Sequence, residues 1–98
     1  MDIHFEKNGV LFVWDEHKAA SNPRKHDRVT FEQATEAFFD PFLKLVDAGR
    51  NDEARDAVIG YDVSGRMLFV VHVEIEGEAI RLISARKATV TERNHYDF

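Results

Sequence analysis

The sequence predicts one compact α+β domain over residues 1–98: an antiparallel sheet of about four strands, two N-terminal helices and a short C-terminal helix. Three observations lead to this fold class. A chain of 98 residues fits a single small domain. Two threonines each stand three positions before a Gln or Glu, which is the capping-box pattern that opens helices. Apolar runs in the second half are joined by short turns, so consecutive strands should pair antiparallel, with the helices on one face.

The first elements are a hairpin and a helix. Asn8-Gly9 is a pair that tolerates positive φ and suits a tight turn between two apolar runs. The flanking strands are expected near residues 2–6 and 10–14. Asp15 can cap a helix that starts at the following residue. Pro23 removes one helical hydrogen bond, so this helix should end or kink near Asn22.

Two capping boxes predict the other helices. Thr30 and Gln33 open the second N-terminal helix, which Asp40-Pro41 stops. Thr89 and Glu92 open a C-terminal helix of about two turns. The intervening strands are expected over residues 41–47, 57–63, 66–75 and 79–86.

The last predicted strand contains two arginines. In strict alternation, one sheet face carries Arg81, Ile83 and Ala85, and the other carries Ile80, Leu82, Ser84 and Arg86. One arginine therefore lies on or beside a largely apolar face. An unpaired buried charge is costly, so that arginine should pair with a carboxylate or line a cleft.

The composition excludes several kinds of site. The chain has no cysteine, and so no disulfide, thiolate nucleophile or cysteine-based zinc site. Its five histidines are scattered and the glycine motifs that cradle nucleotide phosphates are absent, so we expect no metal and no cofactor. No apolar run is long enough to span a membrane, and the N-terminus lacks the apolar region of a signal peptide. We therefore expect a cytoplasmic protein without a membrane partner.

Charge is segregated along this acidic chain. The net charge is −5, and residues 32–62 contain eight acidic and three basic residues. The C-terminal stretch instead gathers Arg81, Arg86, Lys87 and Arg93. A local group of cations is what an anion-binding site requires. Solvated surface charge without a binding role explains the same pattern equally well.

Two clusters contain candidate functional residues. In "NPRKHDR", Lys25 and His26 lie at the link between two helices, and histidine is suited to proton exchange near neutral pH. The alternative is that these cations only stabilise a helix C-terminus. In the C-terminal stretch, Arg86 lies beside a helix N-terminus, which favours an anion. Arg93 and Tyr96 share one face of that helix.

Four segments together form a recognisable pattern: "FVWDEHKAASNPRKH", "VTFEQATEAFFD", "GRMLFVVHVE" and "IRLISARKATVTERNHY". In this order they resemble the BrnT family of bacterial toxins. The resemblance implies a RelE-like ribonuclease fold and a role as the toxin of a type II toxin–antitoxin pair. The implied partner is a BrnA antitoxin, a DNA-binding protein that neutralises the toxin and with it represses the shared operon. The chain departs from the family pattern at Asp27, where glycine is usual, and at Pro23.

The leading hypothesis from this resemblance is a metal-independent endoribonuclease toxin that reaches operator DNA only through its antitoxin. Proton transfer is assigned to Lys25 or His26, and phosphate binding to Arg81 and Arg86. RNA binding is assigned to Arg66, Arg93 and Tyr96, although Arg66, beside Gly65 in a hairpin, is equally well explained as ordinary turn surface. The alternative is a catalytically degenerate toxin-like module that acts as antitoxin partner and co-repressor, which Asp27 and the net charge favour. In a third interpretation, the acidic segment 32–62 binds a basic protein.

Overall fold

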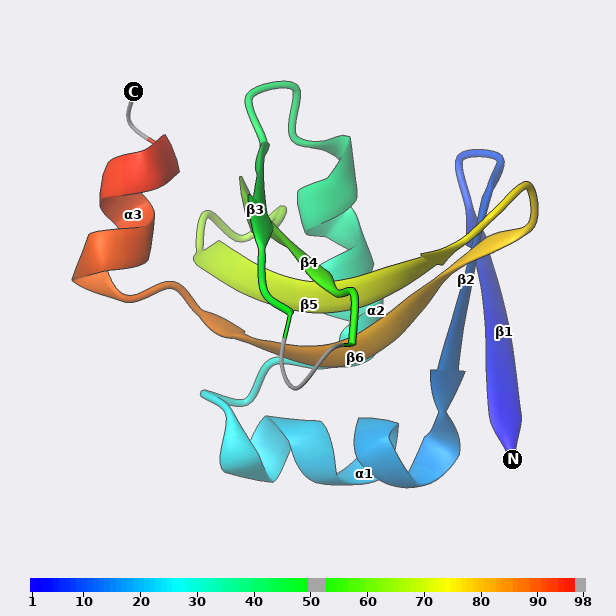
Figure 1. Ribbon diagram of the computed structural model, residues 1–98. Coiled ribbons are helices and arrows are strands. Elements are labelled where there is room, and N and C mark those ends of the chain that lie inside the picture. The colour runs from blue at the N-terminus through cyan, green and yellow to red at the C-terminus, as the bar shows by residue number, and fades with distance from the viewer. Residues whose placement is uncertain (50–52, 97–98) are drawn as a thin grey trace.

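The computed structural model describes residues 1–49 and 53–96, which form a six-stranded sheet, three α-helices and one 3-10 helix (Figure 1). The strands are β1 (Asp2–Lys7), β2 (Val10–Asp15), β3 (Lys44–Asp47), β4 (Asp56–Tyr61), β5 (Met67–Ile75) and β6 (Ala79–Lys87). The helices are α1 (Glu16–Lys25), α2 (Phe31–Glu36), the 3-10 helix η1 (Ala37–Phe39) and α3 (Val90–Tyr96). None of these helices is long and apolar enough to cross a membrane.

The sheet is mixed, with the strand order β1-β2-β6-β5-β4-β3. Neighbouring strands pair antiparallel except β2 and β6, which run parallel where Phe12 meets Ile80 and Val13 meets Arg81. The α+β class and the first hairpin are confirmed. The predicted sheet of about four antiparallel strands is wrong in strand number and in the direction of one pair. Parallel strands are joined by a long crossover, so no local pattern reveals that these two segments are neighbours.

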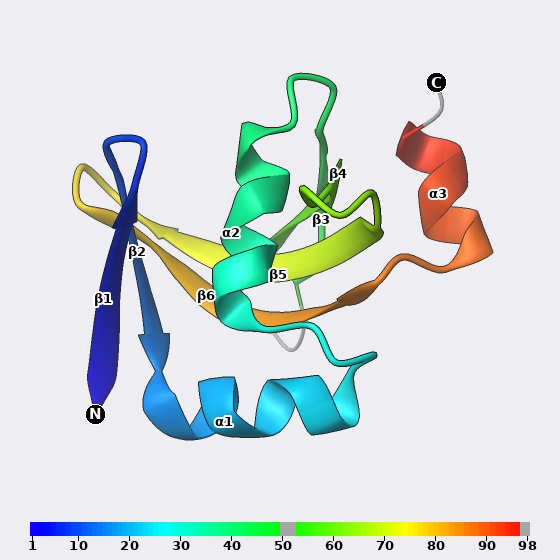
Figure 2. The same ribbon diagram turned by 180° about the vertical axis from the view of Figure 1, so that it is seen from behind.

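The helices were expected to lie together on one face of the sheet. They lie instead at three different places around it. α2 and η1 cover one face (Figure 2), where Phe31, Ala34 and Ala37 join the buried side chains of β2, β4, β5 and β6. α1 runs along the edge of the sheet beside β6, and α3 lies beyond the end of β6 (Figure 1). The expected arrangement is therefore wrong for α1 and α3. The described helices leave the opposite face of β5 and β6 open.

The predicted helix starts are confirmed by hydrogen bonds. The Lys18 N–H donates to the Asp15 carboxylate at 3.0 Å, and Thr30 and Gln33 exchange bonds of 3.1 and 3.0 Å. The first helix continues through Pro23 to Lys25 and does not end at Asn22. Tertiary bonds hold this last turn in place and outweigh the hydrogen bond that proline removes.

The last turn of α1 is held by the edge of β6. Past Arg81, no strand of the described chain pairs with this edge. Asn22 takes the place of a strand: its amide donates to the carbonyls of Ala85 and Val29 at 2.8 Å each, and its oxygen accepts from the Ala85 N–H at 3.2 Å. Asp27 accepts from the Lys87 N–H at 3.2 Å. Two side chains therefore satisfy an edge that would otherwise offer unpaired main-chain groups.

β6 contains one more residue than the part of β5 that it pairs with. Val71 pairs with Ser84 but His72 pairs with Leu82, so Ile83 forms a bulge. A bulge breaks the alternation of side chains between the two sheet faces. Leu82 and Ala85 both enter the core. The side chains that remain on the open face are Arg81, Ile83, Ser84 and Arg86. The predicted separation of the two arginines onto opposite faces is therefore wrong.

The bonds of Asn22 lead to a prediction about stability. Asn22→Ala should lower the free energy of unfolding by about 2–4 kcal/mol, because it leaves three main-chain groups without their partners. Asn22→Asp should not restore stability, since its second oxygen would face two carbonyl oxygens. Urea denaturation measures both effects. Asn94→Ala, on an exposed position of α3, is the matched control. Equal stability of Asn22→Ala and Asn94→Ala would contradict the bridging role.

Candidate active site

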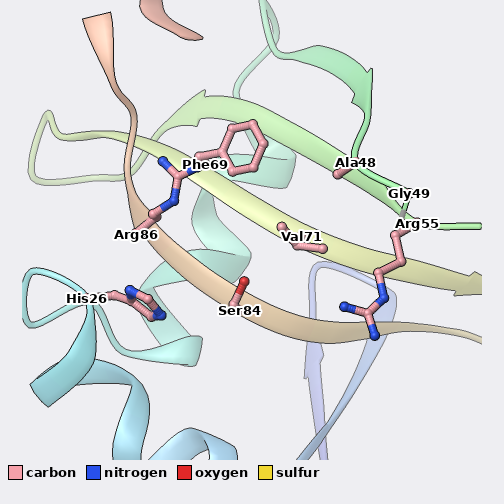
Figure 3. A pocket seen from close by; sticks show the side chains of 8 residues that line it. All are labelled: His26, Ala48, Gly49, Arg55, Phe69, Val71, Ser84 and Arg86. Atoms are coloured by element: carbon pink, nitrogen blue, oxygen red, sulfur yellow. The ribbon is translucent and has the colours of Figure 1, made fainter. Parts of the chain in front are cut away.

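A hollow of about 490 Å³ opens on the sheet face that α2 does not cover (Figure 3). Its lining residues are His26, Ala48, Gly49, Arg55, Phe69, Val71, Ser84 and Arg86. β5 and β6 form the floor, the link after α1 supplies His26, and the segments that flank β3 and β4 form the far wall. His26 and Arg86 lie toward one end and Arg55 toward the other, with Ser84 between them (Figure 3).

His26 is positioned by the main chain on both sides of it. It ends α1, where its N–H donates to the Asn22 carbonyl at 2.8 Å and its carbonyl accepts from the Val29 N–H at 3.0 Å. The imidazole is half-buried and also lines a smaller adjoining hollow of about 150 Å³. Lys25 and Ser84 line this smaller hollow too. The structure therefore brings Lys25, His26 and Arg86 to two hollows that share His26 and Ser84.

Arg86 is fixed on three sides. Its Nη1 and Nη2 donate to the two carboxylate oxygens of Glu92 at 2.7 and 2.8 Å. Its Nη1 also donates to the Lys87 carbonyl at 3.2 Å, and the guanidinium lies 4.4 Å from the centre of the Phe69 ring. The hydrogen bonds to Glu92 raise the pKa of Arg86 above its already high value. Arg86 is thus a permanent, oriented cation in the hollow.

Glu92 joins the site to the last helix. Its carboxylate accepts from the Thr89 N–H at 2.8 Å, and its own N–H donates to the Thr89 hydroxyl at 3.2 Å, which confirms the predicted capping box. Burial tends to raise the pKa of Glu92, but hydrogen bonds from Arg86 and Thr89 outweigh burial and lower this pKa overall. The start of α3 and the orientation of Arg86 therefore depend on one carboxylate.

Asp27 adopts the backbone conformation that glycine would supply. Its φ is 55° and that of Arg28 is 61°, both in the left-handed region. Asp and Asn enter this region more readily than other residues with side chains. The Asp27 carboxylate also bonds to β6, as described above, so this departure from the family pattern is accommodated without opening the link.

The other predicted site residues lie outside the hollow. Arg81 donates to Asp2 at 2.7 and 3.3 Å and lines an adjoining hollow further along β6. Arg66 bonds Asp62, Gln33 and the Asp27 carbonyl, which ties the β4–β5 turn to the link after α1. The Tyr96 hydroxyl donates to Asp40 at 2.8 Å, and its ring meets Tyr61, so it docks α3 on the body of the protein. Arg93 is exposed on α3.

Sequence reasoning missed Arg55 and Phe69. Arg55 falls in a charged segment with no recognisable pattern, and only the return of the chain through β4 brings it to the hollow. It pairs with Glu53 at 2.6 Å. The position of Phe69 could have been predicted in part, because alternation along β5 places Phe69 and Val71 on the same face of the sheet. Among residues 1–49 and 53–96, no three His, Asp or Glu side chains gather as metal ligands.

The family model for the ribonuclease toxin BrnT of type II toxin–antitoxin systems matches residues 14–92. The chain belongs to this family. The match includes His26, Arg86 and Glu92, so the whole arrangement at one end of the hollow lies inside the BrnT region. It excludes β1, with the Asp2 partner of Arg81, as well as Arg93 and Tyr96. No curated protein matches the chain.

The lowered pKa of Glu92 predicts part of the acid sensitivity of the fold. The unfolded value is near 4.5 and the folded value is lower, so the carboxylate stabilises the fold above pH 4.5. This stabilisation is lost as the pH falls through the folded pKa. Glu92→Gln should therefore flatten the dependence of the unfolding free energy on pH below 4.5, as measured by urea denaturation across that range.

Thr89→Ala is the matched control, since it removes one cap bond and leaves the ion pair. It should cost about 1 kcal/mol at neutral pH and largely keep the acid dependence. If Glu92→Gln and the parent lost stability equally on acidification, the ion pair between Glu92 and Arg86 would not contribute to the acid sensitivity of the fold.

Proposed function

We propose that this chain is itself an active endoribonuclease, which cleaves RNA without a metal at the hollow between His26 and Arg86. The observation that carries the proposal is the convergence of an imidazole and an oriented guanidinium on one hollow, in a chain of a ribonuclease toxin family. Transphosphorylation of RNA requires a proton acceptor, a proton donor and cations near the phosphate. The residues around this hollow are of those three kinds.

In the proposed reaction, His26 removes the proton from the ribose 2′-OH. The 2′ oxygen then attacks the adjacent phosphorus, and the bond from phosphorus to the 5′ oxygen breaks. The leaving oxygen takes a proton from Lys25 or from the imidazolium that the first step creates. The products are a 2′,3′-cyclic phosphate and a free 5′-OH. No atom changes its oxidation state, and no co-reactant is needed.

The free edge of Arg86 supports its role at the phosphate. A guanidinium has five N–H donors. Glu92 and the Lys87 carbonyl use three of them, all on Nη1 and Nη2. Within the described residues, this leaves the Nε–H and one Nη2–H, which lie side by side on the same edge of the plane. Arg86 can therefore bind two phosphoryl oxygens while Glu92 holds its other edge. A group oriented in advance needs no rearrangement when charge develops in the transition state.

One observation favours the catalytically degenerate alternative. Both arginines of the hollow already have carboxylate partners, Glu92 for Arg86 and Glu53 for Arg55. Paired carboxylates reduce the attraction for RNA. The two functions differ in a simple outcome, because a degenerate module would bind its antitoxin without cleaving RNA.

The proposed partner is a BrnA-type antitoxin that neutralises the chain in the cytoplasm and links it to operator DNA. Part of the acidic segment is unavailable to such a partner, because Asp40, Glu36 and Asp62 accept hydrogen bonds within the chain. Glu32 and Asp56 are exposed, and their side chains accept no hydrogen bond from the described residues. We assign to these two carboxylates the steering of a basic antitoxin segment.

The proposed roles predict the effects of substitutions in the hollow. His26→Ala should slow RNA cleavage by about 100-fold or more, as expected for loss of a general base. Arg86→Lys keeps the charge but loses the planar fork, and should also slow cleavage by about 100-fold. The measurements are cleavage of RNA by purified protein and growth on expression without antitoxin.

His95→Ala and Arg24→Lys are the matched controls, because both residues are exposed and neither lines the hollow. Thermal unfolding must first show that every variant folds. Parent-like toxicity of both His26→Ala and Arg86→Lys would contradict the assignment of the active site to this hollow. A harmless parent that still binds its antitoxin would support the degenerate alternative.

The steering role predicts a salt-dependent association. The rate of binding between the chain and its antitoxin should fall as ionic strength rises, because exposed charges are screened beyond about 8 Å at physiological salt. Glu32→Gln combined with Asp56→Asn should weaken this dependence, and Glu78→Gln, at the exposed β5–β6 turn, should not. Stopped-flow mixing measures the rate. A rate that is constant from low to physiological salt would show that charge steering does not contribute to antitoxin binding.

A further inference from the structure

A second hollow, of about 370 Å³, lies further along the open face of the sheet. Its lining residues are Glu53, Ala54, Arg55, Val73, Ile75, Arg81 and Ile83. Arg55 lines both this hollow and the candidate active site, so the two are contiguous. The floor is aliphatic and half-buried, formed by Val73 and Ile75 of β5 and Ile83 of β6. The two arginines at this floor are each paired with a carboxylate, Arg81 with Asp2 and Arg55 with Glu53. The hollow therefore suits the apolar faces of a ligand more than a strongly charged group.

Arg81 lines this second hollow and is held at one edge by a carboxylate. Its Nη1 and Nη2 donate to the two oxygens of Asp2 at 3.3 and 2.7 Å. A carboxylate bound at this edge lies near the guanidinium plane, so Asp2 orients the plane without covering either face. The pairing with Asp2 also raises the pKa of Arg81. Guanidinium planes are surfaces on which the unstacked bases of single-stranded RNA bind.

The bulge at Ile83 is what gives the two hollows a common face. Without the extra residue, alternation would put Arg81 on the face opposite to Ser84 and Arg86. With it, all three side chains lie on the open face, on which Phe69, Val71, Val73 and Ile75 of β5 also lie. A strand of RNA can therefore contact both hollows without passing around an edge of the sheet.

We propose that the second hollow binds one nucleobase of the RNA, next to the nucleotide whose phosphate lies at Arg86. The base stacks on the Arg81 plane and contacts Ile83, and Arg55 attracts the backbone between the two hollows. This inference rests on the proposed ribonuclease function and identifies where that site holds its substrate. Stacking surfaces accept every base, so the hollow contributes affinity and register more than sequence choice.

The test is a series of short RNA substrates, each with one abasic nucleotide, at positions on both sides of the cleaved bond. In the parent, removal of the base at one flanking position should lower kcat/KM about tenfold, because stacking of one base contributes roughly that factor. Arg81→Lys keeps the charge and loses the plane, so it should cleave intact RNA at about the rate of the parent on the abasic substrate. Ile83→Ala should lower kcat/KM on intact RNA by a smaller factor and keep part of the abasic response, because the Arg81 plane remains. Arg81→Lys should not respond further to the abasic position.

Arg24→Lys is the matched control, since it makes the same change on the exposed surface of α1. It should keep the full response to the abasic position. A parent that cleaves RNA with equal kcat/KM at every abasic position would overturn the base site and leave the proposed function intact. A full abasic response in Arg81→Lys would also overturn it. A parent that cleaves no RNA would refute the proposed function, and the base site with it.

The other possible occupant is a segment of the antitoxin. If Arg81→Lys and Ile83→Ala weakened antitoxin binding while their abasic profiles matched the parent, the hollow would be a protein-binding site and the proposal would be wrong.

Discussion

The side-chain amide of Asn22 is the constraint on which the open face of this protein depends. β2 leaves β6 after Val13–Arg81, and the amide then satisfies both main-chain groups of Ala85 together with the Val29 carbonyl. These bonds stabilise the last turn of α1, which continues beyond Pro23, and they position His26 beside β6. A covering strand here would leave no room for the link between the helices, whereas a bare edge would invite pairing with another chain. The Asn22 amide, together with the Asp27 carboxylate at Lys87, avoids both outcomes.

The bulge at Ile83 complements that constraint. Asn22 needs the main chain of Ala85 at the edge, and the core needs the side chains of Leu82 and Ala85. Simple alternation cannot put both side chains in the core and also keep Arg81 beside the rest of the open face. With the extra residue, Leu82 and Ala85 both point into the core and Arg81 still lies on the open face. The open face therefore has a continuous aliphatic floor along β5, with cations contributed by β6 and by the chain that precedes β4.

Local signals in the sequence predicted local structure. The caps at Asp15, Thr30 and Thr89 involve residues three positions apart, and all three are confirmed. The parallel pair and the bulge depend on which segments meet in three dimensions, so no window of sequence contains them. The same holds for the site. Lys25, His26 and Arg86 were singled out from two local clusters and the family resemblance then suggested their roles, whereas Arg55 reaches the hollow only through the path of β3 and β4. Arg66 and Tyr96 make hydrogen bonds within the fold, and their assignment to RNA stays a prediction.

The net charge of −5 is a poor guide to the field that RNA would meet. Three of the carboxylates in the acidic segment accept hydrogen bonds from main-chain N–H groups of this chain: Glu36 from Val63, Asp40 from Tyr61 and Asp62 from Arg66. Charges further than about 8 Å from a phosphate are largely screened at physiological salt, so the groups around the hollow decide its affinity. There, Glu92 neutralises much of the charge of Arg86 but leaves one donor edge oriented. If the hollow has the proposed function, such a site would attract RNA weakly from a distance and hold the reacting phosphate once it arrives. This would suit an enzyme that must bind its transition state more tightly than its substrate.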